Sequence, residues 1–148
     1  MQVNLVWHPS IKLPKKMDGC DYELIPQAPG IYIFLRIYGE DAEALYVGKS
    51  ENIRRRIKQQ FNNRRLMDAI KDARNGERRL VFAEFAPKKG KMHKNALEIT
   101  EETFISHYLA LGHGLVNIKG TRLRHHEIRS ERGELKQFLP ISAKLHLR

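Results

Sequence analysis

The chain has 148 residues, of which 41% are apolar, and its 27 Lys and Arg outnumber its 17 Asp and Glu to give a net charge of +10. This length and apolar content fit one domain with one hydrophobic core and argue against global disorder. The single cysteine, Cys20, excludes an internal disulfide and a thiolate metal cluster. No run reaches transmembrane length and no signal-peptide pattern is present, so we expect a reduced, soluble, cytoplasmic protein without a membrane partner.

The positive charge is concentrated in part of the chain. Residues 49–94 carry 15 basic and 5 acidic side chains, whereas residues 95–118 carry 3 acidic side chains and no Lys or Arg. The overall excess favours nucleic acid, or another polyanion, as the partner. There are two alternatives: a basic surface kept for solubility, and a surface for an acidic protein partner. The second predicts little salt-sensitive binding to nucleic acid.

The first third of the chain predicts a strand, an extended arm and a hairpin. Alternation over residues 2–7 predicts the strand, and four prolines up to position 29 predict an arm with turns. Residues 30–38 are rich in Ile, Tyr and Phe and predict a strand, which a polar turn over residues 39–43 joins to a strand at residues 44–48. The two form an antiparallel hairpin.

Two helices are predicted after the hairpin. Ser50 is a candidate N-cap for the first, and the two asparagines at 62–63 end it and cap the second, which we expect to end at Gly76. Both helices have an apolar stripe. The stripe of the first helix consists of Ile53, Ile57 and Phe61, and that of the second of Leu66, Met67, Ile70 and Ala73. On the first helix, Arg54 and Arg56 flank the stripe and Arg55 lies opposite.

The rest of the chain adds a strand at residues 79–86 and a helix at residues 96–111, and we expect a short helix near 130–139. The fold class is therefore α+β, with a small antiparallel three-stranded sheet flanked by helices and the strand at residues 2–7 as a candidate extra strand. We divide the chain into an N-terminal extension at 1–29, a central domain at 30–117 and a basic C-terminal extension at 118–148.

Several motifs in the central segment resemble the GIY-YIG nuclease superfamily. Gly30-Ile31-Tyr32 and Tyr46-Val47-Gly48 resemble its paired signature, Lys49 follows as in repair-type members, and Arg56 stands eight residues after Gly48, where the family has its catalytic arginine. Downstream, residues 101–105 (Glu-Glu-Thr-Phe-Ile) resemble the glutamate helix and residues 115–117 (Leu-Val-Asn) resemble the closing element. The resemblance covers residues 30–117 and implies an endonuclease.

The resemblance also implies roles for the matching residues. Tyr32 or Tyr46 would act as general base on water, and the choice between them stays open. Arg56 would hold a non-bridging phosphate oxygen, with Lys49 as a second electrophile. Asn117 would bond a backbone group near the site or the substrate, and its alternative is a structural amide that ends a strand. The structural alternative for both tyrosines is a pair of core aromatic residues with satisfied hydroxyl groups.

The acidic helix would supply the metal ligand. One glutamate that holds Mg²⁺ or Mn²⁺ with waters and a substrate phosphate suits an ion that stays partly hydrated. Glu101 shares a helix face with apolar residues and stands where relatives have their glutamate, so we favour it over Glu102. Glu98 is expected to be solvated.

The sequence thus predicts a metal-dependent endonuclease that hydrolyses phosphodiester bonds of nucleic acid, most simply DNA. Its alternative is a non-catalytic nucleic-acid-binding protein with the same fold, and the oligomeric state stays open. Three features depart from the family pattern: a longer segment between Tyr32 and Tyr46, Gln60 where some relatives have a phenol, and the turn at residues 112–114. The cations expected to contact nucleic acid are Arg54, Arg55, Lys58, Arg64 and Arg65.

Overall fold

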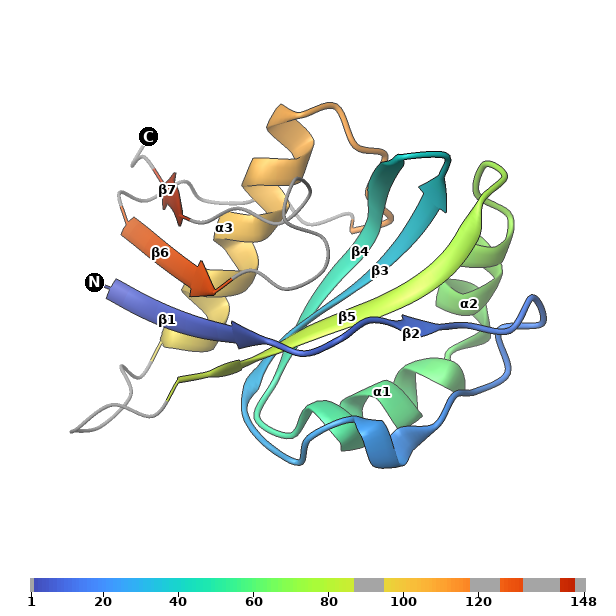
Figure 1. Ribbon diagram of the computed structural model, residues 1–148, viewed down its shortest axis with the longest axis horizontal. Helices are drawn as coiled ribbons and strands as arrows, with labels where there is room; N and C mark the ends of the chain where they lie inside the picture. Colours follow the sequence, from blue (N-terminus) through green and yellow to red (C-terminus); the bar gives the residue numbers. More distant parts are fainter. Residues whose placement is uncertain (1, 87–94, 118–125, 132–141, 146–148) are drawn as a thin grey trace.

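The computed structural model describes residues 2–86, 95–117, 126–131 and 142–145. These residues form a curved sheet with helices on both faces (Figure 1). The strands are β1 (Gln2–Trp7), β2 (Ile11–Lys12), β3 (Gly30–Tyr38), β4 (Asp41–Ser50), β5 (Glu77–Phe85), β6 (His126–Glu131) and β7 (Ser142–Leu145). The helices are the 3-10 helix η1 (Tyr22–Leu24) and the α-helices α1 (Ile53–Phe61), α2 (Arg64–Lys71) and α3 (Ala96–Ala110). The predicted α+β class and the antiparallel β3–β4–β5 centre are confirmed.

The described sheet is larger than the three strands predicted. Its order is β4-β3-β5-β1-β6-β7, with β2 also paired to β5. The predicted N-terminal strand extends the sheet by pairing antiparallel to β5, as Leu5 opposite Phe85 shows. β6 pairs parallel to β1 and was not predicted. It includes residues 130 and 131, where a helix was expected, and residues 132–139 of that expected helix lie outside the described part of the chain.

The β3–β4 hairpin has a tighter turn than predicted. β3 ends at Tyr38 and β4 begins at Asp41, so Gly39 and Glu40 alone form the turn. Two-residue hairpin turns need positive φ, and Gly39 has a φ of 62°. The long segment between the two signature tyrosines therefore lengthens the strands and not the turn. A register shift between Phe34 and Leu35 accommodates it.

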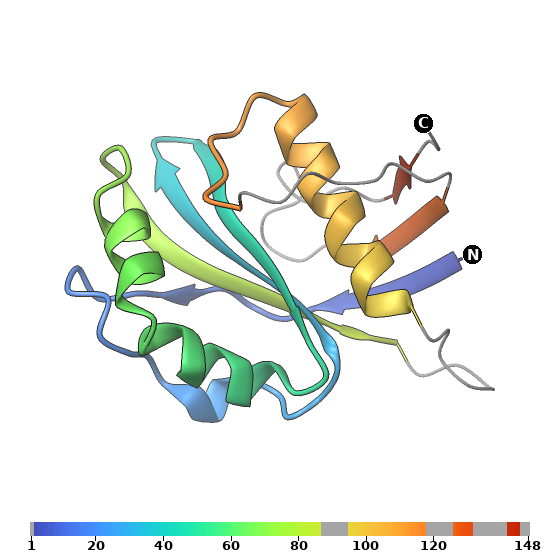
Figure 2. The same ribbon diagram turned by 180° about the vertical axis from the view of Figure 1, so that it is seen from behind.

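Alternation along β3 divides the core between the two faces of the sheet. Ile31, Ile33 and Leu35 pack in one cluster with residues of α3, while Tyr32 and Phe34 pack in the other with residues of α1 and α2. Figure 2 shows α3 well separated from the α1–α2 pair. The predicted stripe of α1 is buried, as is that of α2 except for half-buried Ala73. The sheet thus separates an α1–α2 face from an α3 face.

Asn52, and not Ser50, caps α1. The Asn52 side chain accepts a hydrogen bond from the backbone N–H of Arg55, so the helix begins at Ile53. The Ser50 hydroxyl instead donates to the Asn52 carbonyl and accepts from the Asn52 N–H. The prediction of Ser50 as N-cap was wrong because the strand continues through Ser50, which leaves the asparagine two residues later to cap the helix.

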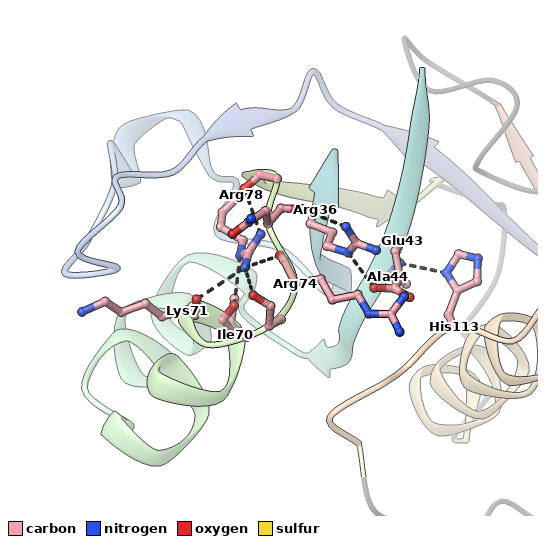
Figure 3. Close-up of polar contacts among 11 residues, drawn as sticks. Arg36, Glu43, Ala44, Ile70, Lys71, Arg74, Arg78 and His113 are labelled. Atoms are coloured by element: carbon pink, nitrogen blue, oxygen red, sulfur yellow. Dashed lines mark hydrogen bonds and ion pairs between the residues drawn. The ribbon is translucent and has the colours of Figure 1, made fainter. Parts of the chain in front are cut away.

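α2 ends at Lys71, five residues before the predicted end at Gly76. Asn63 caps its start, as predicted. After Lys71, the guanidinium of Arg78 on β5 binds the carbonyl groups at the helix end and in the following turn (Figure 3). It donates to the carbonyl oxygens of Ile70, Lys71, Ala73, Arg74 and Gly76. The end of α2 is thus capped by a side chain from the following strand, and no terminal glycine marks it in the sequence.

Candidate active site

The two signature glycines stand where no side chain fits. A Cβ on Gly48 would lie against the Cζ and Oη atoms of Tyr32, because the Tyr32 ring crosses the backbone of Gly48 on the neighbouring strand. A Cβ on Gly30 would lie against the carbonyl oxygen of Ala83 and the Cδ1 of Ile53. The glycines therefore allow the tyrosine ring and helix α1 to approach the sheet closely.

Tyr32 and Tyr46 lie together on the α1–α2 face, and Gln60 of α1 connects them. Their ring centroids are 6.2 Å apart. The side-chain amide of Gln60 donates to the Tyr32 Oη over 2.7 Å and to the Tyr46 Oη over 3.4 Å. Gln60 is only 4% exposed. The two phenols thus lie close together, and a buried amide connects them.

The two phenols differ in their access to solvent. Tyr32 is 1% exposed, whereas Tyr46 is half-buried. Burial raises the pKa of Tyr32 far above its ordinary value of about 10, and the neighbouring Tyr46 raises it further. The hydrogen bond from Gln60 and the nearby guanidinium of Arg56 offset only part of this rise. A sealed phenol that resists ionisation is poorly suited to take a proton from water.

The three consecutive arginines of α1 point to different places. The Arg54 Nε donates to the carbonyl oxygen of Ile25 over 2.8 Å, so this side chain holds the N-terminal arm. Arg55 and Arg56 are exposed, and the Nη1 of Arg56 donates to the Oε1 of Gln59 over 3.3 Å. The structure separates Arg54 from Arg56, which helix periodicity alone does not.

A pocket of about 420 Å³ lies between the end of β4 and the first turns of α1. Lys49 and Ser50 line it from β4, Arg55, Arg56 and Gln59 line it from α1, and Glu51 lies between the two elements. Three cations and one carboxylate therefore surround it, which suits a phosphate. Because alternate residues of β4 face opposite sides of the sheet, Tyr46 and Gly48 face α1 while Val47 and Lys49 face α3.

Glu101 on α3 lies close to the hairpin, as the predicted site requires. Its Oε1 is 4.0 Å from the Nζ of Lys49, and the two side chains are 19% and 38% exposed. Glu102 is half-buried, and Glu98 is exposed in the first turn of the helix, as expected. Glu101 is therefore the carboxylate joined by a described ion pair to a residue that also lines the pocket.

Residues 113–117, which we call the strap, hold the chain after α3 against the outer edge of β4. The backbone N–H of Ala44 donates to the Nδ1 of His113 over 2.8 Å (Figure 3). The N–H of Val116 donates to the carbonyl oxygen of Leu45 over 2.7 Å. The Asn117 side chain accepts from the Val47 N–H over 2.9 Å and donates to the Val47 carbonyl over 2.8 Å. Asn117 thus bonds backbone next to the site.

The remaining cations predicted to contact nucleic acid lie on the outer surface of α1 and α2. Lys58, Arg64 and Arg65 are all exposed. The Nζ of Lys58 is 5.3 Å from the centroid of the Tyr22 ring, and the Nη2 of Arg64 is 3.5 Å from the Oδ1 of Asp68. Exposed pairs of this kind are weak, so the cations can exchange their partners for phosphates. Their role in binding stays a prediction.

The donor set at Glu101 fits one hydrated divalent ion and no larger cluster. Among residues 2–86, 95–117 and the described parts of the tail, no group of three or more His, Cys, Asp and Glu side chains is arranged to hold a metal. A single carboxylate suits Mg²⁺, which keeps several waters and takes further ligands from substrate phosphate.

Comparison with known proteins supports the resemblance of the signature motifs. The family model described as the GIY-YIG catalytic domain matches residues 28–112. The chain belongs to the GIY-YIG catalytic-domain family. This membership supports a nuclease function for the domain.

Beyond its family, the chain is similar to UvrABC system protein C of Protochlamydia amoebophila (strain UWE25), with 46% identity over 48 residues. The matched segment is 32% of this chain and 7% of that protein. No solved structure matches the chain. None of the described helices is long and apolar enough to span a membrane.

Two residues of this GIY-YIG domain were not predicted to act at the site. Gln60 was noticed only as a missing phenol, although its position one residue before Phe61 on the buried side of α1 was available from the helical period. The sequence also predicts no role for His113 at the site. No local signal indicates its contact with Ala44, because the two residues are 69 positions apart.

Proposed function

We propose that this domain is a divalent-metal-dependent endonuclease that hydrolyses phosphodiester bonds of DNA. The observation that carries the proposal is the pocket at the end of β4, where Lys49 and Arg56 approach from different elements. Two lining residues connect this pocket to further groups: the guanidinium of Arg56 lies near Tyr32 of the phenol pair, and Lys49 forms an ion pair with the carboxylate of Glu101. Phenols and a carboxylate are groups that a nuclease needs for proton transfer and for metal binding.

Tyr46 is the proposed general base. Its half-buried phenol can meet water, whereas Tyr32 is sealed beneath it. In the reaction, the oxygen of a water molecule attacks the phosphorus and its proton passes to the Tyr46 phenolate. The bond from phosphorus to one ester oxygen breaks, and that oxygen leaves on the other end of the cut strand, where it takes a proton from solvent while Tyr46 returns its proton to solvent. Tyr32 helps to hold Tyr46 in place, because Gln60 is hydrogen-bonded to both phenols.

Arg56 is the proposed phosphate clamp. Its guanidinium is exposed in the pocket wall, so a phosphate oxygen can reach it without rearrangement of the fold. A planar guanidinium that binds two oxygens gains strength as negative charge builds up on the phosphate. Lys49 adds a second positive charge on the opposite wall.

Glu101 is the proposed ligand of Mg²⁺ or Mn²⁺. The ion, when bound, supplies positive charge to the leaving oxygen and the phosphate. In the structure the Lys49 ammonium lies 4.0 Å from the Glu101 carboxylate. We therefore expect metal and Lys49 to compete for this carboxylate, and Lys49 to turn toward the phosphate when the ion binds.

A cutting assay with matched variants tests the proposal. Full-length chain would be incubated with single-stranded, duplex, flap and branched DNA in Mg²⁺ or Mn²⁺. Arg56→Ala is expected to lower the cutting rate by about 10²–10³-fold, and Glu101→Ala to remove stimulation by metal. Arg74→Ala removes an exposed arginine outside the pocket and is the control, with the rate expected to stay near wild type.

DNA binding measured on the same variants separates the proposal from its alternative. Binding of duplex by Arg56→Ala is expected to fall only a few-fold, because the other cations remain. If the wild-type chain binds these substrates in a salt-dependent manner and cuts none of them with either metal, the domain is a non-catalytic nucleic-acid-binding protein and the enzyme proposal is wrong.

A further inference from the structure

Gln60 occupies a position where a polar side chain needs a specific reason to be present. It lies on the buried side of α1 beside Ile57 and Phe61, where the helix otherwise presents apolar side chains to the sheet. A primary amide in such a position is costly unless its groups are hydrogen-bonded. The two N–H groups of its amide have two partners, the phenol oxygens of Tyr32 at 2.7 Å and Tyr46 at 3.4 Å.

The direction of these hydrogen bonds has a chemical consequence. A donor that bonds a phenol oxygen stabilises the phenolate more than the phenol. An amide does not ionise at any working pH, so Gln60 cannot take the proton itself. It also fixes the spacing of the two rings, which are tilted by 31° and whose centroids are 6.2 Å apart.

We propose that Gln60 is a positioning residue that donates to both phenol oxygens and orients Tyr46 as a hydrogen-bond acceptor. This inference deepens the proposed function and rests on it, because it gives Gln60 its role through the proposed base. Gln60 does not touch the pocket, whose α1 wall consists of Arg55, Arg56 and Gln59.

The test uses two substitutions at position 60 and two kinds of measurement. Gln60→Met keeps an unbranched side chain of similar length but cannot donate, and Gln60→Glu keeps the shape but turns the donor into an acceptor. Gln27→Met, at an exposed glutamine, is the control. The first measurement is the NMR shift of the phenol carbon of Tyr32 and Tyr46, assigned with Tyr→Phe variants. The second is the cutting rate as a function of pH.

Both phenol signals are expected to move in Gln60→Met and Gln60→Glu and to stay in place in Gln27→Met. The alkaline rise of the cutting rate should shift to higher pH by about one unit in Gln60→Met, because the phenolate loses a hydrogen-bond donor. At pH values below that rise, the cutting rate of Gln60→Met should be about tenfold lower than that of wild type. Gln60→Glu should shift the rise at least as far, since its carboxylate repels a phenolate.

Two results would overturn the role of Gln60. One is a folded Gln60→Met chain, verified by circular dichroism, in which both phenol signals are unchanged. The other is a rate that falls equally at every pH, which indicates general loss of packing. If the wild-type chain cuts no substrate, the proposed function fails, while the NMR shifts still determine whether Gln60 holds the two phenols.

Discussion

The two faces of β4 hold their functional groups by different means. On the α1–α2 face, Tyr32, Tyr46 and Gln60 come from a segment of 29 residues and lie within an aromatic core. On the α3 face, Lys49 meets Glu101 across 52 positions of sequence, and at the outer edge of the strand the strap reaches β4 from up to 71 positions away. One half of the site is thus formed by local packing and the other by long-range hydrogen bonds.

The half of the site with the phenols should be more rigid than the half with the Glu101 carboxylate. The phenol pair is held by glycines, aromatic rings and a buried amide, so its geometry is set when the hairpin and α1 fold. The carboxylate half is partly exposed and tied by a 4.0 Å ion pair, which is a weak constraint. We expect the aromatic half to respond to changes in packing and the acidic half to respond to metal, pH and salt.

The largest effect is expected from Gly48→Ala. The new methyl group would collide with the Tyr32 ring, and moving that ring misplaces Tyr46 through Gln60. Overpacking of this kind costs about 1–3 kcal/mol, and misplacement of catalytic groups by 1 Å costs about 10²-fold in rate. Denaturant unfolding and the cutting assay measure the two effects.

Gly114→Ala is the matched control for stability in that experiment. Nothing lies within 4 Å of the Cβ position at Gly114, so its free energy of unfolding should stay within about 0.5 kcal/mol of wild type. Equal destabilisation by the two substitutions would contradict the close contact between Gly48 and Tyr32.

A smaller, selective effect is expected from Asn117→Ala. The substitution leaves the N–H and carbonyl of Val47 without their side-chain partner, which costs about 1–3 kcal/mol of stability. Because the strap follows α3, cutting should need more Mg²⁺ than in wild type, and added metal should restore much of the rate. If the phenol signals of Tyr32 and Tyr46 move as far as they do in Gln60→Met, the two halves are not independent and the comparison fails.

The acidic half should also carry a pH dependence through His113. Its Nδ1 accepts the Ala44 N–H and must be unprotonated, and burial lowers the pKa of His113 below its ordinary value, partly opposed by Glu43. The folded state therefore binds the proton less readily than the unfolded state. This contribution to stability is complete above the unfolded pKa of about 6.5 and is lost as pH falls through the folded pKa.

Unfolding measured between neutral and mildly acidic pH, on wild type and His113→Gln, checks this prediction. The stability of wild type should fall more steeply with acidification than that of the variant. A second histidine on α3, His107, also has a pKa lowered by burial, so some slope should remain in His113→Gln. Identical slopes in the two proteins would show that the His113 contact does not titrate with folding.

The smallest effects are expected from single exposed cations outside the catalytic set. Lys58→Ala and Arg65→Ala should each lower the salt dependence of DNA binding, by a slope of about 0.9 for each duplex phosphate that the variant no longer neutralises. The cutting rate at saturating DNA should change little. Arg74→Ala, on the turn after α2, is the control, and a drop in slope equal to that of Lys58→Ala would mean that the binding surface is not confined to α1 and α2.

Arg54→Ala offers a different contrast, since Arg54 holds the N-terminal arm through Ile25. Removal of this hydrogen bond should reduce stability by about 1 kcal/mol. The salt dependence of DNA binding should change less than it does for Lys58→Ala. If the salt slope instead falls as far as it does in Lys58→Ala, Arg54 belongs to the nucleic-acid contacts predicted from the sequence.

The sequence predicted those parts of the structure that depend on local patterns. The hairpin, the buried stripe of α1 and the helix at Ala96–Ala110 follow from periods of two and 3.6 residues. The residues predicted to act in catalysis lie on β4 or next to it, whereas Arg54, Lys58, Arg64 and Arg65 lie elsewhere on α1 and α2. Their catalytic roles stay predictions, because geometry alone does not measure proton transfer or metal affinity.

The features that the sequence did not predict depend on contacts between distant residues. The end of α2 is determined by Arg78 across a turn, and the parallel pairing of β6 with β1 joins the two ends of the chain. The role of Gln60 required the position of two phenols on another element. Sequence spacing identifies the residue types of a site, whereas the partners of each polar group become known only when the elements are packed.

The strap has a consequence for assembly that goes beyond the chemistry of the site. β4 is the outer strand of the described sheet, and unpaired outer strands are where a second chain can add a strand of its own. His113, Val116 and Asn117 occupy backbone groups of Ala44, Leu45 and Val47 along that edge. The strap therefore also shields the edge of β4 from self-association. Any change that releases the strap should produce a protein that is both less active and more prone to aggregate.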